Sequence, residues 1–167
     1  MTTRDHLIAH VQDMYAFARD YLPVLHAQGR MCRLERLRDL LGQQHADLRD
    51  EMETLERVLN LLSARFTMER SPIVPGLEQA SRRFRYRMNP SREQLDLHLA
   101  LETLAVSQLI IGKYQGEIEL ARAIGEQDVV LLLQENLTRQ EQGQRALRQF
   151  LPTLLQEAGP EEIRRVA

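Results

Sequence analysis

Apolar residues recur along most of the chain every three to four positions, the period of a helix with one buried face. We predict a first helix from about Arg4 to Ala27, capped by Thr2 or Thr3 and ended by Gly29. Pro23 removes one backbone hydrogen bond inside it and is a potential kink. Its apolar stripe consists of Leu7, Val11, Met14, Ala18, Tyr21 or Leu22, and Leu25.

A second, longer helix is predicted from Cys32 to Arg65. Leucines recur there every seven residues, as in the seam of a helical bundle. These leucines are Leu34, Leu41, Leu48, Leu55 and Leu62. A second seam through Leu37 and Val58 is interrupted by Gln44 and Glu51, which we interpret as polar residues that set the packing register.

The pattern weakens over residues 66–89, where Pro75 followed by Gly76 indicates a loop and residues 77–87 can form a short helix. A third long helix is expected to begin at an Asn89 or Ser91 cap and to close at Gly125. A fourth spans Gln127 to Glu157, and the tail from residue 159 onward is expected to fray.

Two helical hairpins joined by one long connection form the ferritin-like version of a four-helix bundle. The fold class predicted from the sequence is therefore all-α. It is a ferritin-like four-helix bundle whose one long crossover carries a short extra helix. Residues 1–158 form a single domain in this interpretation, and residues 159–167 form the tail.

Composition narrows the range of functions. The 167 residues carry a formal net charge of -2, so no global field attracts nucleic acid or an anionic membrane. Cys32 is the only cysteine, so no internal disulfide can form, as is usual in a reducing compartment. The charged N-terminal residues do not resemble a secretory signal, and no uninterrupted apolar run is long enough to span a membrane. We therefore expect a cytoplasmic protein without membrane contact.

Side chains suited to metal binding are sparse. Ferritin-like di-metal sites use Glu-x-x-His motifs, and none occurs in this sequence. His6 and His10 share one helix face beside the apolar stripe, which makes them weak surface candidates for a metal. His98 and Glu102 are also four residues apart, and we interpret them as a surface pair or as a polar interruption at a dimer seam.

Short stretches in all four long helices match, in order and spacing, those of one known family. They are Asp13-Met14-Tyr15 with Leu22-Pro23, Leu55-Glu56-Arg57-Val58, Asn89-Pro90, Tyr114 with residues 119–125, and Leu132-Leu133-Gln134-Glu135. On these stretches the chain resembles the YciE/YciF family, which consists of bacterial, ferritin-like, stress-associated proteins.

The resemblance also places the family's metal ligands on this sequence, and most of them have been replaced. The corresponding positions are Ala18, Gln44, Asp47, Ser107, Gln108, Ile110, Arg139, Gln140 and Gln144. Only Asp47 keeps a carboxylate. The resemblance therefore implies a scaffold that has lost its di-iron site, is not an enzyme, and holds no cofactor. The alternative is a metal-binding or oxidoreductase protein that uses the residual acids Asp47, Glu51, Glu102 and Glu135.

Two further features suggest binding. Residues 95–111 are apolar on more than one helix face, which favours a homodimer through this helix over a helix buried in one bundle. The segment 82–92 interleaves arginines with aromatic residues, and its candidates for an anion are Arg82, Arg83, Arg85 and Arg87. We favour a solvated helix with Phe84 packed inward, so nucleic-acid binding is the less favoured interpretation.

Cys32, near a helix start, is expected to be a free surface cysteine, with a lowered pKa as the other interpretation.

Overall fold

The computed structural model describes residues 1–159. It confirms an all-α, ferritin-like bundle, and the predicted tail lies outside the described residues except for Gly159. Five helices follow one another along the described chain: α1 (Thr3–Met31), α2 (Glu35–Leu61), α3 (Val74–Met88), α4 (Arg92–Ala123) and α5 (Gln127–Glu157).

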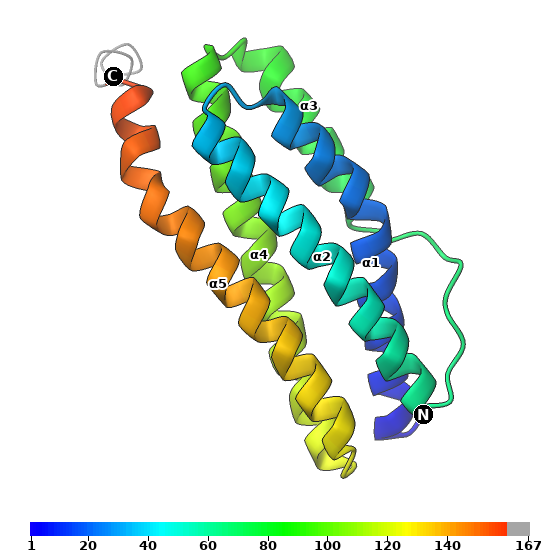
Figure 1. Cartoon of the computed structure of the whole chain (residues 1–167). Helices are drawn as coiled ribbons and strands as arrows, with labels where there is room; N and C mark the ends of the chain where they lie inside the picture. The colour runs from blue at the N-terminus through cyan, green and yellow to red at the C-terminus, as the bar shows by residue number, and fades with distance from the viewer. Residues whose placement is uncertain (160–167) are drawn as a thin grey trace.

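The four long helices form a ring in which each packs against two neighbours. α1 packs against α2 and α4, and α5 packs against α4 and α2. After α2 the chain returns along the outside of the bundle, through a loop and then α3, so that α4 runs in the same direction as α2 (Figure 1). This return segment is the single long crossover that the sequence predicts.

Capping residues in the sequence set some of the helix boundaries, and other boundaries differ from the prediction. The Thr2 and Ser91 side chains complete capping boxes at the starts of α1 and α4, and Gly125, with φ of 79°, follows α4 as predicted. Asn89, the other candidate cap for α4, instead ends α3 in a left-handed conformation. The prediction that Gly29 ends the first helix is wrong. α1 continues through this glycine to Met31, and the backbone N–H of Cys32, at the helix end, donates to the Gly29 carbonyl oxygen.

The second helix is shorter than predicted at both ends. It begins at Glu35 because the backbone N–H groups of Arg33 and Leu34 donate to the Asp96 carboxylate, at 2.9 and 3.0 Å, and so stay outside the helix. α3 begins earlier than expected, with Pro75 in its first turn, where a missing N–H is harmless. α5 has the bounds that the sequence predicts.

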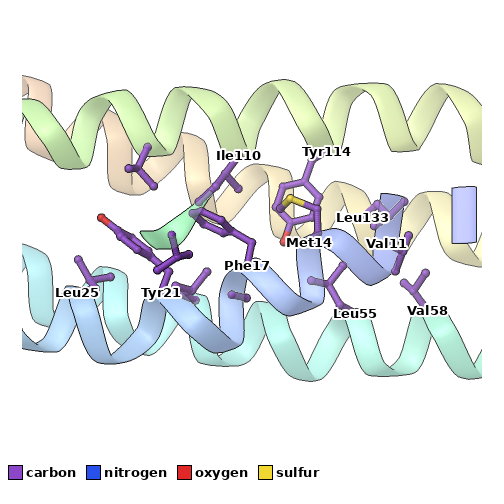
Figure 2. Packing of buried hydrophobic residues seen from close by; sticks show 14 of the residues in the cluster. Val11, Met14, Phe17, Tyr21, Leu25, Leu55, Val58, Ile110, Tyr114 and Leu133 are labelled. Carbon is purple, nitrogen blue, oxygen red and sulfur yellow. The ribbon is translucent and has the colours of Figure 1, made fainter. Parts of the chain in front are cut away.

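The core runs along the bundle axis and draws on all four long helices. Figure 2 shows side chains from α1, α2, α4 and α5 pointing toward one another, with Tyr114 reaching from α4 into the layer that holds Met14 and Leu133. α4 is long and apolar enough, by length and composition alone, to cross a membrane. Central helices of water-soluble bundles meet the same criterion, and α4 is packed between α1 and α5.

Candidate functional site

The positions that the family resemblance assigns to metal ligands meet at one place in the bundle. Gln44, Ser107, Ile110 and Gln140, from α2, α4 and α5, all line a void of about 10 Å³ between the helices. The rest of its lining is Tyr21, Leu25, Leu48, Thr103 and Val106. A void of that volume is barely large enough for one water molecule.

The chemistry of this lining does not fit a di-metal centre. It consists of amides, hydroxyls and apolar groups, with no carboxylate and no imidazole. Two metal ions in a low-dielectric core need several anionic ligands to offset their charge. Over residues 1–159, no group of three or more His, Cys, Asp and Glu side chains is placed to hold a metal ion.

The other positions that correspond to the family's metal ligands lie around this void and do not form a metal site. Ala18 is buried among apolar side chains. Asp47 is partly exposed and accepts a hydrogen bond from Gln43, four residues earlier, at 2.9 Å. Gln144 donates to Gln108 across the exposed seam between α5 and α4, at 3.1 Å. The one retained carboxylate therefore belongs to the surface of α2.

Next to the void, a buried carboxyl group organises a polar network. Glu51 is fully buried and accepts from the Tyr114 hydroxyl at 3.0 Å and from the Gln140 amide at 2.9 and 3.1 Å. Asn136 donates to the Tyr114 hydroxyl at 3.1 Å and to the Glu51 carbonyl at 3.2 Å, and it accepts from Arg139. The prediction that Glu51 is a polar residue of a packed seam agrees with this arrangement.

Burial dominates the titration of this network. It raises the pKa of Glu51 from 4.5 to about 8, against the opposing effect of the hydrogen bonds from Gln140 and Tyr114. The pKa of Tyr114 is likewise raised, first by burial and then by the neighbouring charge of Glu51. At neutral pH the network is therefore held largely in its uncharged form, which suits a structural cluster in a closed core.

The remaining acids do not join Glu51. Glu135 is exposed on α5. Glu102 accepts from the Gln28 amide at 3.0 Å, and burial raises its pKa. His98 and Glu102 form the predicted pair, with 3.9 Å between His98 Nε2 and a Glu102 carboxyl oxygen. The pair is more covered than a surface pair, because the Phe84 ring stacks on the His98 ring at 3.7 Å between centroids.

One buried acid was missed by the sequence analysis. Glu117 on α4 is 1% exposed, and neither carboxyl oxygen has a hydrogen-bond partner among the described residues. Burial holds its pKa well above the usual range, against the opposing charge of Lys113, and the nearby charge of Asp13 adds a smaller upward effect. Its place three residues after Tyr114 and seven after Ile110 was the available signal, because that spacing puts it on the buried face. His6 and His10, the surface candidates, are both exposed on α1.

The arginine segment separates into two faces of α3. Arg82, Arg83 and Arg87 are exposed, and Arg85 is partly buried. Of these four arginines, Arg82 and Arg85 line a groove between α1 and α3. Phe84 packs inward as predicted. Among the described ion pairs of this segment, only Arg82 has an acidic partner. Its partner is Glu78, at 3.7 Å.

Cys32 differs from its prediction. Its side chain is buried rather than exposed, and its thiol donates to the Gln28 carbonyl at 3.4 Å. Burial raises the thiol pKa to about 12, helped by the neighbouring Asp96 charge. A reactive surface cysteine is therefore the wrong interpretation.

Sequence comparison assigns the chain to a family. The profile described as "Domain of unknown function (DUF892)" matches residues 2–159. No curated protein is detectably similar in sequence.

Solved structures share the fold over nearly the whole chain. The E. coli stress protein YciF superposes with a TM-score of 0.86 and 18% identity, covering 93% of this chain and 98% of YciF. YcfI from Rhodopseudomonas palustris has a TM-score of 0.83 and 20% identity over 89% and 94% of the two chains. A protein from Xanthomonas campestris pv. campestris has a TM-score of 0.79 and 17% identity over 96% and 99%. At these identities the likeness shows the fold alone. Together with the family match, it confirms the resemblance found in the sequence.

Proposed function

We propose that this chain, which belongs to the DUF892 family, is a non-catalytic, ferritin-like protein that acts by binding a partner and not through a metal centre. The observation that supports the proposal is the small void, of about 10 Å³, at the positions that correspond to the family's ligands. Gln44, Ser107, Ile110 and Gln140 offer it only neutral or apolar groups. We extend to this chain the stress association stated for YciF, and we place the protein in the cytoplasm.

The lost ligands have been replaced in a way that closes the core. Ala18 and Ile110 are apolar and buried, and the Gln140 amide now donates to Glu51 instead of facing an ion. Well-packed apolar groups and satisfied amides are stable in a dry core, whereas several carboxylates without metal ions would repel one another there. The replacements are therefore those expected of a bundle selected to stay folded without metal.

The partner in this proposal is a second copy of the chain, bound through the outward face of α4. The apolar surface that residues 95–111 expose to solvent is smaller than the sequence suggested. Leu99, Val106 and Ile110 in this segment are buried within the bundle. Leu101 and Leu109 remain 47% and 40% exposed. The stripe they begin continues beyond residue 111.

Two exposed glycines extend this stripe. A Cβ atom added at Gly112 or Gly116 would meet nothing within 4 Å, so the helix backbone itself is open to a neighbour. Glycines four residues apart allow two helices to approach closely, and the flanking leucines Leu109 and Leu120 supply apolar contact. We therefore centre the proposed dimer contact on residues 101–120.

Sedimentation equilibrium tests the dimer. The wild-type chain is expected to sediment as a dimer, and Leu109→Asp as a monomer, because a buried carboxylate without a partner is unfavourable at an interface. Leu131→Asp is the matched control, since Leu131 is 60% exposed on α5, away from the stripe. A wild-type monomer at micromolar concentration, or equal dissociation of both variants, contradicts the dimer.

Anaerobic titration with Fe(II) tests the other half of the proposal. Calorimetry is expected to show no saturable binding at micromolar protein, because the void presents no anionic ligand. Saturation at one or two ions per chain would contradict the proposal and favour the metal-binding alternative. Substituting Asp47 and Glu51 in turn would then locate the ion.

A further inference from the structure

A groove of about 590 Å³ lies between α1 and α3, on the outside of the bundle. It exists because α3 lies alongside α1 yet buries only Val74 and Ser81 fully (Figure 1). Its α1 side is mainly apolar, and its α3 side is mainly polar. The lining residues are Asp20, Pro23, Val24, Ala27, Gln28, Arg30, Met31, Glu78, Ser81, Arg82 and Arg85.

Arg85 lies in this groove with its hydrogen-bonding capacity largely unused. Its buried Nε atom has no acceptor among the described residues, and Nη1 reaches only the Met31 sulfur, at 3.1 Å. A thioether is a weak acceptor, whereas a guanidinium group matches the paired oxygens of an oxyanion. By contrast, Arg33 at the end of the bundle contacts two carboxylates.

The acidic side chains near the groove do not pair with the Arg85 guanidinium. Both Asp20 oxygens are taken, one by the Arg19 guanidinium and the other by the Ser71 N–H. Glu78 pairs with Arg82 on the same helix. Arg30 forms no ion pair among the described residues. Three arginines against two acids leave the lining with a net charge of about +1 at neutral pH.

Glu102 lies behind the groove on α4, and its charge partly offsets that of Arg85. It already accepts from the Gln28 amide, and no ion pair joins it to Arg85. Its interactions therefore hold the floor of the groove together, while the guanidinium donors remain without oxygen acceptors.

We propose that this groove binds a small organic carboxylate with an apolar body. The carboxylate head accepts from Arg85, with Arg30 as the second cation because Arg82 is paired with Glu78, and the body lies on Val24 and Ala27. The volume is within the range of sites for small molecules, and a singly charged head matches the net charge of the lining. The site is separate from the proposed dimer face, so either proposal can fail without the other.

Titration with phenylacetate, followed by backbone amide NMR shifts at pH 7, tests the site. We expect a dissociation constant on the order of 1 mM for a probe of this size. The shifts should gather at residues 23–31 and 78–85. Acetate and benzyl alcohol, which each carry half of the probe, should bind at least about tenfold more weakly.

Substitutions distinguish the groove from general attraction to arginine. Arg85→Gln and Arg30→Gln are expected to weaken phenylacetate about ten- to hundredfold, because each removes a charge-assisted contact. Arg83→Gln and Arg87→Gln are the matched controls, since both side chains are exposed outside the groove, and they should change affinity less than twofold.

Either of two results would overturn the proposal. One is the absence of shifts with 20 mM phenylacetate, and the other is equal weakening by groove and control variants. Circular dichroism and the melting temperature of each variant show whether the fold is retained. If Arg85→Gln unfolds α3, Arg30→Gln carries the test, because Arg30 is exposed in the last turn of α1.

Discussion

Replacing the buried Glu51 by glutamine should change how stability depends on pH. Glu51 is fully buried, and its pKa rises from 4.5 to about 8 on folding. Because the folded state holds this proton more tightly than the unfolded state, the free energy of unfolding falls as pH rises between these two values. The loss is small below pH 4.5 and complete above pH 8.

The magnitude follows from the two pKa values. Each unit of difference corresponds to about 1.4 kcal/mol, so a carboxyl with these values destabilises the fold by about 1 kcal/mol at pH 5 and about 4 kcal/mol at pH 8. Glutamine keeps an oxygen acceptor for Tyr114 but has no proton to lose. The stability of Glu51→Gln minus that of wild type should therefore rise by about 3 kcal/mol from pH 5 to pH 8.

Urea unfolding at a series of pH values between 5 and 8 measures this difference. The other titrating groups, including Glu117, are common to both proteins and cancel in the subtraction. Glu135→Gln is the control, because Glu135 is exposed on α5 and its replacement should leave the pH profile unchanged. Parallel profiles for wild type and Glu51→Gln would refute the reasoning that burial governs this carboxyl.

Three other substitutions or reactions test the geometry. Glu117→Leu should raise the free energy of unfolding by about 1–3 kcal/mol at pH 8 and by less at pH 5, because it removes a buried carboxyl whose oxygens lack hydrogen-bond partners among the described residues. A loss of stability in this variant would contradict the prediction. Cys32 should react with iodoacetamide at pH 8 roughly a thousandfold more slowly in the folded protein than in the urea-unfolded protein, because the raised pKa leaves less thiolate. Comparable rates in the two states would contradict the burial of this thiol. Phe84→Ala should lower the free energy of unfolding by about 1–2 kcal/mol and speed hydrogen exchange within residues 74–88, because it removes the stack on His98; unchanged exchange there would contradict that role.

Helical periodicity and local capping signals predict most of this fold. The stripe of apolar residues locates all four long helices, and the bounds of Gln127–Glu157 agree because its start follows the sharp turn at Gly125. The alignment with the family places Gln44, Ser107 and Gln140 around one void. The apolar periodicity and the position of each residue along its helix are enough to predict the helices and the void, because both depend on which face of a helix a residue occupies.

Features that depend on contacts between distant segments could not be predicted in the same way. The late start of α2 depends on Asp96, more than sixty residues further along the chain. The burial of Cys32 depends on the packing of that same junction. Whether Arg85 finds an acid depends on the placement of α3 along α1, which no local pattern in residues 62–73 specifies.

Elemental analysis of freshly purified, untagged protein most directly tests the claim that the di-metal site has been lost. The sample would come from cells grown with added iron and manganese and would be desalted without chelator. Iron, manganese and zinc should each amount to less than about one tenth of an ion per chain, since tight binding needs several anionic ligands that the core does not offer. One or two ions per chain that survive desalting would contradict the account, and the acids of α2, α4 and α5 would then hold the metal.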